Sequence, residues 1–151
     1  MQKITTFLWF DHQAEEAADF YTSIFPDSRV LEAQPGPGGK PMMVVFELAG
    51  QRYMALNGGP ADFSFTEAVS QFVECESQEE VDELWARLTD GGEEGPCGWL
   101  KDRYGLSWQI IPRELPQLLS HPDPEVAGKV ARAMQGMKKI DVQGLRDAAK
   151  S

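Results

Sequence analysis

The sequence predicts an α+β fold in which one βαβββ unit occurs twice in tandem, with a ligand pocket formed by the sheets and a helical tail. Two observations carry this prediction. A strand, an amphipathic helix and three further strands follow one another twice along the chain. The helix pair Phe20-Tyr21 also returns as Leu84-Trp85, and the closing hairpin 50–57 returns as 105–112.

The first unit opens with residues 3–10, whose Thr, Ile and aromatic content predicts a strand. Asp11 is placed to cap a helix over 13–25, which Pro26 ends. Apolar residues at helical spacing predict one buried face of this helix, made of Ala17, Phe20, Tyr21, Ile24 and Phe25. Three more strands are expected at 28–34, 42–49 and 52–57, with a Gly- and Pro-rich turn after the first and a hairpin at Gly50-Gln51.

The second unit repeats this order. Residues 67–75 predict a strand, and Ser77 with Glu80 forms a capping box at the start of the next helix. Gly91-Gly92 ends that helix, whose buried stripe is Val81, Leu84, Trp85 and Leu88. Short strands are expected around 93–101 and 105–111. In the tail, Asp123-Pro124 starts one helix and Asp141 caps a last, short one.

We therefore expect a domain over 1–112, with modules 1–60 and 61–112, and a helical extension over 113–151. The extension is expected to cover a sheet edge or to clasp a second subunit. Alternation along the first strand places Thr6 and Leu8 on the pocket face and packs Phe7 and Trp9 under the helix.

Charge and composition exclude several partners. The formal net charge is −10, and no Lys/Arg run is longer than Lys138-Lys139, so a nucleic-acid partner is not expected. The N-terminus does not read as a signal peptide, and no apolar run is long enough to span a bilayer, which predicts a cytoplasmic protein without a membrane partner. Cys75 and Cys97 lack metal-type or redox-type spacing, although a disulfide between them stays open.

Four stretches resemble one family. They are 95–112 (GPCGWLKDRYGLSWQIIP), 7–25 (FLWFDHQAEEAADFYTSIF), 65–88 (FTEAVSQFVECESQEEVDELWARL) and 133–148 (AMQGMKKIDVQGLRDA). They resemble the PhnB-like branch of the vicinal-oxygen-chelate (glyoxalase, bleomycin-resistance and dioxygenase) superfamily, whose family label is 3-demethylubiquinone-9 3-methyltransferase. The resemblance implies paired βαβββ modules around a half-open mixed β-barrel, and a homodimer. It does not fix an activity, because this scaffold hosts enzymes and plain binding proteins. No Gly-rich loop that could cradle a nucleotide cofactor follows a strand and opens a helix, which speaks against the methyltransferase label.

Catalytic members of the superfamily hold a divalent metal through His, Gln or Glu on the first and last strand of each unit. The matching positions here are Thr6, Met54, Ser70 and Gln109, and only Gln109 lies in a stretch, DRYGLSWQI, that follows the superfamily pattern. Hydroxyls and a thioether are poor ligands for such metals. His12 and His121 are not placed to join Gln109, so we expect no metal site of the usual kind and no cofactor.

The expected pocket still offers polar and aromatic groups. The predicted ligand-binding residues are Thr6, Leu8, Met54, Asn57, Ser70, Trp99, Trp108 and Gln109. Trp99 and Trp108 have an alternative reading as core or dimer-interface packing. Cys97 is a candidate nucleophile and Glu47 a candidate general base, against readings as an inert thiol and an outward-facing carboxylate.

These observations predict a small-molecule binding protein without the usual metal site, whose ligand is aromatic. One alternative is an enzyme of lyase, transferase or dioxygenase type with a non-standard site around Cys97, Gln109 and Glu47. A second alternative is a dimeric interaction module, for which an acidic surface is suitable.

Overall fold

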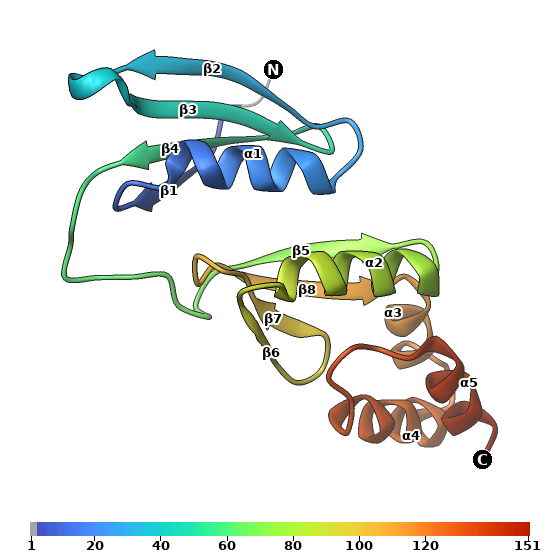
Figure 1. Ribbon diagram of the computed structural model, residues 1–151. Coiled ribbons are helices and arrows are strands. Elements are labelled where there is room, and N and C mark those ends of the chain that lie inside the picture. The colour runs from blue at the N-terminus through green and yellow to red at the C-terminus, as the bar shows by residue number, and fades with distance from the viewer. Residues whose placement is uncertain (1–2) are drawn as a thin grey trace. The chain divides into compact units, whose positions relative to one another are not determined.

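The structure, a computed structural model, describes residues 3–151 and divides into two compact units, Met1–Ser64 and Phe65–Ser151 (Figure 1). Each unit contains one open, four-stranded mixed sheet. The strand orders are β1-β4-β3-β2 and β5-β8-β7-β6, which is one topology used twice. In each unit the first and last strands are parallel neighbours, and the other pairs are antiparallel. The predicted α+β fold of two tandem βαβββ units is therefore confirmed.

The first unit follows the predicted order, with only its first strand clearly shorter than predicted. Its elements are β1 (Thr6–Phe10), α1 (Ala14–Ile24), β2 (Arg29–Pro35), β3 (Pro41–Leu48) and β4 (Gln51–Asn57), with a 3-10 turn at Pro37–Gly39. The hairpin between β3 and β4 turns at Ala49 and Gly50, both at positive φ, one residue earlier than predicted. Glycine adopts this backbone without strain, which is why it marks the turn.

Helix α1 packs along one face of the first sheet, as Figure 1 shows. The aromatic rings of Tyr21, Phe46 and Tyr53 stack between the helix and the strands, with centroids 6.2 Å and 5.4 Å apart. The residues that the helix buries are Ala14, Ala17, Ala18, Tyr21 and Ile24. Phe20 and Phe25, which were predicted for the same face, are only partly buried. Small alanines let the helix approach the sheet closely, so this layer is dense without large side chains.

The start of α1 is capped from a distant part of the chain. The helix begins at Ala14, and the Asn57 Oδ1 atom, at the end of β4, accepts a hydrogen bond from the Ala14 backbone N–H at 2.8 Å. The predicted cap at Asp11 is wrong, because Asp11 lies three residues before the helix and its side chain does not reach the helix amides. A cap from another strand leaves no local sequence signal.

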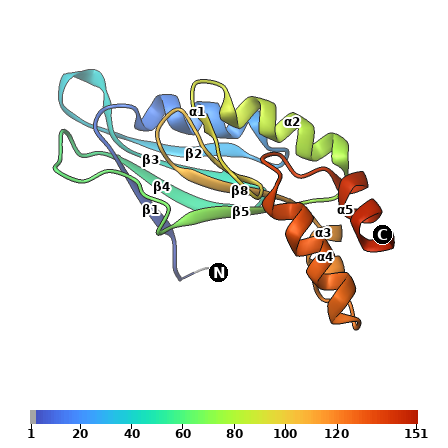
Figure 2. The ribbon, with the colours of Figure 1, turned by 90° about the horizontal axis from the view of Figure 1, so that it is seen from below.

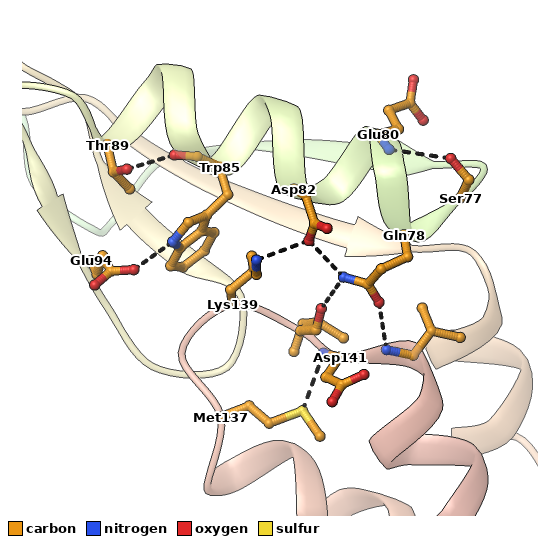
Figure 3. A network of polar contacts seen from close by, with 12 residues as sticks. Ser77, Gln78, Glu80, Asp82, Trp85, Thr89, Glu94, Met137, Lys139 and Asp141 are labelled. Atoms are coloured by element: carbon orange, nitrogen blue, oxygen red, sulfur yellow. Dashed lines mark hydrogen bonds and ion pairs between the residues drawn. The ribbon is translucent and has the colours of Figure 1, made fainter.

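The second unit comprises β5 (Ser70–Cys75), α2 (Gln78–Thr89), β6 (Glu93–Glu94), β7 (Trp99–Lys101) and β8 (Ser107–Pro112). The predicted capping box is present at α2. The Ser77 Oγ atom accepts from the Glu80 N–H at 3.2 Å, and the Glu80 carboxylate accepts from the Glu76 N–H at 2.7 Å. The buried stripe of α2 is the predicted one. The Trp85 indole donates to Glu94 at 2.6 Å, which joins α2 to β6 (Figure 3).

Three helices complete the second unit: α3 (Glu114–Leu119), α4 (Pro124–Gln135) and α5 (Val142–Lys150). They gather near the end of β8 (Figures 1 and 2). The short α3 is not predicted by the sequence. Helices α4 and α5 are the two predicted tail helices. A buried apolar cluster unites these helices with the sheet: Ile111, Leu115, Val130, Ile140 and Leu145. The proposed division at residue 112 thus remains a prediction, while these contacts tie 113–151 to β8.

Gln78 joins the tail to α2 through a polar network (Figure 3). Its amide nitrogen donates to the Ile140 carbonyl at 2.9 Å, and its amide oxygen accepts from the Val142 N–H at 2.7 Å. Lys139 adds an ion pair of 2.9 Å with Asp82 on the same helix. In the described part of the chain, no helix is both long and apolar enough to cross a membrane.

Candidate functional site

Each sheet carries α1 or α2 on one face, and the opposite face is here called its helix-free face, although on the second sheet the tail helices cover its end around Ile111. On the first sheet, the pairing register joins Phe7, Met54 and Val45 across three strands of the helix-free face. The next pair of residues on this face along the two strands is Trp9 and Leu56. Phe7 is 51% and Trp9 39% exposed. This face of the first unit is therefore apolar and accessible.

The predicted facing of β1 is wrong. Leu8 is buried against the helix side of the sheet, and Thr6 lies on that side with Tyr53, whereas Phe7 and Trp9 lie on the helix-free face. Of the four ligand-binding residues predicted in the first unit, only Met54 faces the helix-free side. The error has a simple origin: residues 11–13 join β1 to α1, but only 76–77 join β5 to α2. Aligning the units on their helices displaces the strand by one residue, which reverses its faces.

Asn57 also lies on the helix side, where both ends of its amide make hydrogen bonds within the first unit. Its oxygen caps α1, and its nitrogen donates to the Pro41 carbonyl at 2.9 Å. These bonds give Asn57 a structural role, and its predicted contact with a ligand stays a prediction. Glu47, the candidate base, has Arg29 and Arg52 as its cross-strand partners in the register. Opposite charges on neighbouring strands stabilise a sheet. The neighbours of Glu47 therefore favour a role for this carboxylate in sheet stability.

Trp9 is a well-positioned aromatic group that the sequence reading assigned to the core. Its indole N–H donates to the Gly59 carbonyl at 3.0 Å, and Phe63 packs edge-on at a centroid distance of 5.3 Å. Gly58 lies directly against the ring, since a Cβ there would come within 2.3 Å of an indole carbon. The correct strand phase would have revealed the exposed indole from sequence.

The helix-free face of the second sheet brings together three predicted ligand-binding residues: Ser70, Trp99 and Gln109. Trp99 and Phe72 are the register partners of Gln109 on either side. The Gln109 side-chain nitrogen donates to the Ser70 Oγ atom at 3.0 Å. Among the described residues, nothing donates a hydrogen bond to the Gln109 side-chain oxygen. An amide with a free acceptor thus lies between two aromatic rings.

Trp108, the fourth predicted residue of this unit, points to the opposite side. It is 2% exposed, and its indole N–H donates to the Asp102 carboxylate at 2.8 Å. Asp102 also accepts from the backbone N–H groups of Tyr104 and Leu106, so it holds the turn between β7 and β8. Trp108 belongs to the core, which is the alternative reading given above.

A cavity of about 160 Å³ opens on the second unit beside these residues. It is lined by Glu67, Glu93, Glu94, Gly95, Pro96, Trp99, Leu100, Lys101 and Ser107. Lys101 and Glu67 form an ion pair of 2.6 Å. Hydrogen bonding to Lys101 lowers the pKa of Glu67, and the same bond raises the pKa of Lys101. Ser107 has no solvent exposure, and its Oγ is the one buried side-chain polar atom of the described residues without a partner. A buried hydroxyl left unpaired costs about 1–3 kcal/mol.

A larger cavity of about 350 Å³ lies where α2, α3 and α5 begin. Four of its charged residues form two ion pairs. Arg113 pairs with Glu76 at 2.6 Å, and Arg146 forms a bidentate pair with Glu114. This cavity offers a ligand no free charge of either sign among these four residues.

The two cysteines are free thiols, so the open question of a disulfide between them is answered for this structure. Cys97 is partly buried and sits at φ 59° in the β6–β7 loop, where its backbone N–H bonds the Met137 carbonyl at 2.8 Å. No hydrogen bond engages its thiol among the described residues. Cys75 is fully buried, and burial raises the pKa of its thiol to about 12.

Of the four predicted metal positions, Met54, Ser70 and Gln109 lie on the helix-free faces, and Thr6 does not. Met54 pairs with Phe7, and Gln109 pairs with Phe72. One amide, one thioether and two phenyl rings do not fit the oxygen and nitrogen ligand sets of such metals. Over residues 3–151, no group of three or more His, Cys, Asp and Glu side chains is arranged to hold a metal ion.

Comparisons with known proteins place this chain. A family model described as 3-demethylubiquinone-9 3-methyltransferase matches residues 2–111. No curated protein matches the chain. The solved structure of the PhnB protein from Bacillus cereus is 38% identical, covers 74% of this chain and 99% of its own, and has a TM-score of 0.66.

Two more distant structures share the fold alone. Protein PA1353 from Pseudomonas aeruginosa is 18% identical over 74% of this chain and 98% of its own, with a TM-score of 0.61. The fosfomycin resistance protein FosX from Listeria monocytogenes, complexed with Mn(II) and sulfate, is 19% identical over 72% and 90%, with a TM-score of 0.52. From the family match and the Bacillus relative together, the chain belongs to the PhnB-like, 3-demethylubiquinone-9 3-methyltransferase family.

Proposed function

We propose that this protein binds a small organic molecule with an aromatic part on the helix-free face of its second sheet, without the divalent metal of catalytic relatives. The observation that carries the proposal is the Gln109–Ser70 pair between Trp99 and Phe72. Ligand sites are mostly apolar with a few polar groups that fix orientation, and this face has that composition. A flat ring would stack on Trp99 or Phe72 while Gln109 accepts its hydrogen bond.

The side chains available to bind a metal or to act in catalysis support ligand binding rather than metal-assisted catalysis. On the helix-free faces of this chain, Met54 and Gln109 have Phe7 and Phe72 as register partners, and this set suits a divalent metal poorly. No hydrogen bond from a base supports Cys97 as a nucleophile among the described residues, and Glu47 lies between two arginines. The Gly-rich residues 36–40 connect two strands and do not open a helix, so they do not support a nucleotide-cofactor site of the kind the family label implies. A cytoplasmic homodimer remains part of this proposal.

Thermal unfolding with added ligands tests the proposal. Benzamide or indole at about ten times its Kd should stabilise the protein by about 1.4 kcal/mol, because a ligand that binds only the folded state raises its stability. For a chain of this size, that corresponds to a Tm increase of about 3–6 °C. Gln109→Ala should remove the increase. Gln117→Ala, an exposed glutamine on α3, is the matched control and should keep it.

Two results would contradict the proposal. One is an aromatic-induced Tm increase of equal size in Gln109→Ala and in the unmodified protein. The other is a stoichiometric divalent metal in the purified protein that Gln109→Ala releases, since this would make Gln109 a metal ligand.

A further inference from the structure

Three hydrogen-bond donors stand in a row on the helix-free face of the second sheet. Lys101 on β7 pairs in register with Ser107 on β8, and Ser107 pairs with Ser70 on β5. The Ser70 Oγ accepts from Gln109, so its own hydrogen stays available. The ammonium group and two hydroxyls therefore present donors along one line of cross-strand neighbours.

The central member of this row lacks a partner. Ser107 lines the 160 Å³ cavity with Lys101, has no solvent exposure, and makes no hydrogen bond through Oγ. Buried polar groups are nearly always paired, and an unpaired one calls for a specific explanation. Because the neighbouring Lys101 can only donate, the partner that Ser107 lacks is best supplied by an acceptor that Lys101 also holds.

Lys101 already holds a carboxylate. Its ammonium lies 2.6 Å from Glu67, a residue of the exposed segment that precedes β5. The Glu67 side chain is 61% exposed, so water can replace Lys101 around it at little cost. The same bond raises the pKa of the Lys101 ammonium, a group that is already charged at neutral pH.

We propose that this cavity binds the carboxylate group of a small aromatic acid, and that in the free protein Glu67 competes with that carboxylate for the Lys101 ammonium. This inference rests on the proposed function and names the ligand class. The incoming carboxylate displaces Glu67 from Lys101 and accepts a hydrogen bond from Ser107, while its ring lies toward Trp99. No covalent bond changes, so the step is an exchange of one carboxylate for another.

The surrounding charges set the strength of this exchange. Glu93 is the register partner of Lys101 and stays beside it, so the two charges balance once Glu67 has left. Glu94 points to the other side of the sheet, where it accepts from the Trp85 indole. The chain carries a net charge of −10, which weakens the attraction of any anion. Binding is therefore expected to be modest and to depend on the aromatic ring as well as on the charge.

Titration of the full chain with sodium benzoate, followed by calorimetry, tests the inference, with benzamide as the uncharged probe. Glu67→Gln removes the competing carboxylate and should tighten benzoate binding about threefold, the scale of an exposed ion pair. Lys101→Met should weaken it about tenfold, as expected for a charge-assisted hydrogen bond. Glu79→Gln on α2 removes the same charge from an exposed residue that does not line the cavity, and should change little.

Ser107→Ala is expected to change two measured quantities, the Tm of the free protein and the affinity for benzoate. It removes an unpaired buried hydroxyl, so the Tm of the free protein should rise while benzoate binding weakens. A serine that only supports the fold would lower the Tm instead, and that result would overturn the role given to Ser107.

The inference fails if Glu67→Gln weakens benzoate binding, or if Glu79→Gln tightens it equally, which would reduce the effect to net charge. It also fails if benzoate binds equally well to Lys101→Met. In these cases benzamide binding that depends on Gln109 would leave the proposed function standing. Absence of binding by both benzoate and benzamide would overturn both.

Discussion

Cys75 and Cys97 differ in their surroundings, and the difference sets their reactivity. The thiolate is the reactive form of cysteine. Burial raises the pKa of the Cys75 thiol to about 12, and three nearby glutamates, Glu80 foremost, add to the shift. Cys97 is partly exposed in a loop. Sequence spacing alone could exclude a metal motif for these two residues but could not rank their exposure.

Alkylation with iodoacetamide at pH 8 should therefore modify Cys97 in the folded protein and leave Cys75 intact until the chain is unfolded in urea. Mass spectrometry of tryptic peptides measures both sites. Cys97→Ser is the control and should take up no label in the folded state. Equal labelling of both cysteines without urea would show that the packing around Cys75 opens readily.

Whether a site residue was predicted on the correct face of its sheet depended on how the alternation of side chains along its strand was positioned. Gln109, Ser70 and Trp99 reach one face, as expected, because the turn glycine Gly105 fixes the phase of β8. Leu8 was predicted on the wrong face because β1 was aligned with β5 through the helices, and the turn between strand and helix is one residue longer in the first unit. A one-residue error reverses every side chain of a strand, so phase is the least robust part of such a reading.

At the scale of elements, Gln78 has a role that no local motif announces. It stands at the first turn of α2 and makes two hydrogen bonds to the backbone around the start of α5, to Ile140 and Val142. These bonds satisfy a carbonyl and an amide that would otherwise lose partners as the segment packs against α2. The contact spans more than sixty residues, so only the folded chain can place it.

Gln78→Ala should lower the free energy of unfolding by about 1–3 kcal/mol, because two partly buried backbone groups lose their partners. Urea unfolding measures the change, and hydrogen exchange should show faster exchange at the Val142 amide. Gln143→Ala, which removes only an exposed contact to Asp147, is the matched control and should have little effect. Unchanged exchange at Val142 would mean that the packing of Ile140 and Leu145 holds α5 without Gln78.

At the scale of the whole molecule, the extension 113–151 lies beyond the family match, which ends at residue 111. Its helices nevertheless share a core with the last strand, since Ile111 packs with Val130, Ile140 and Leu145. The loop that carries Cys97 also bonds this segment, through the carbonyls of Met137 and Lys138. Covering β8 and this loop is thus a structural function of the extension.

Leu145→Ala should destabilise the second unit by about 2–5 kcal/mol, the usual cost of a cavity at a fully buried leucine. Because the extension shares its core with β8, this unit should still unfold in one transition by calorimetry. Leu119→Ala, at a leucine that is 37% exposed, should cost less. A separate, early transition of the extension in Leu145→Ala would show that it folds independently of the sheet.

The sequence by itself determined the tandem βαβββ order, the helix faces, the capping box of α2 and the place of Gln109. These features depend on contacts within a few residues or on a periodic pattern, so the local sequence contains them. Only the tertiary structure decided which face of β1 is free of its helix, that Asn57 caps α1, and that Ser107 lies unpaired beside Lys101 and Glu67. These features join residues far apart in the chain, and their partners are chosen by packing and register rather than by local sequence.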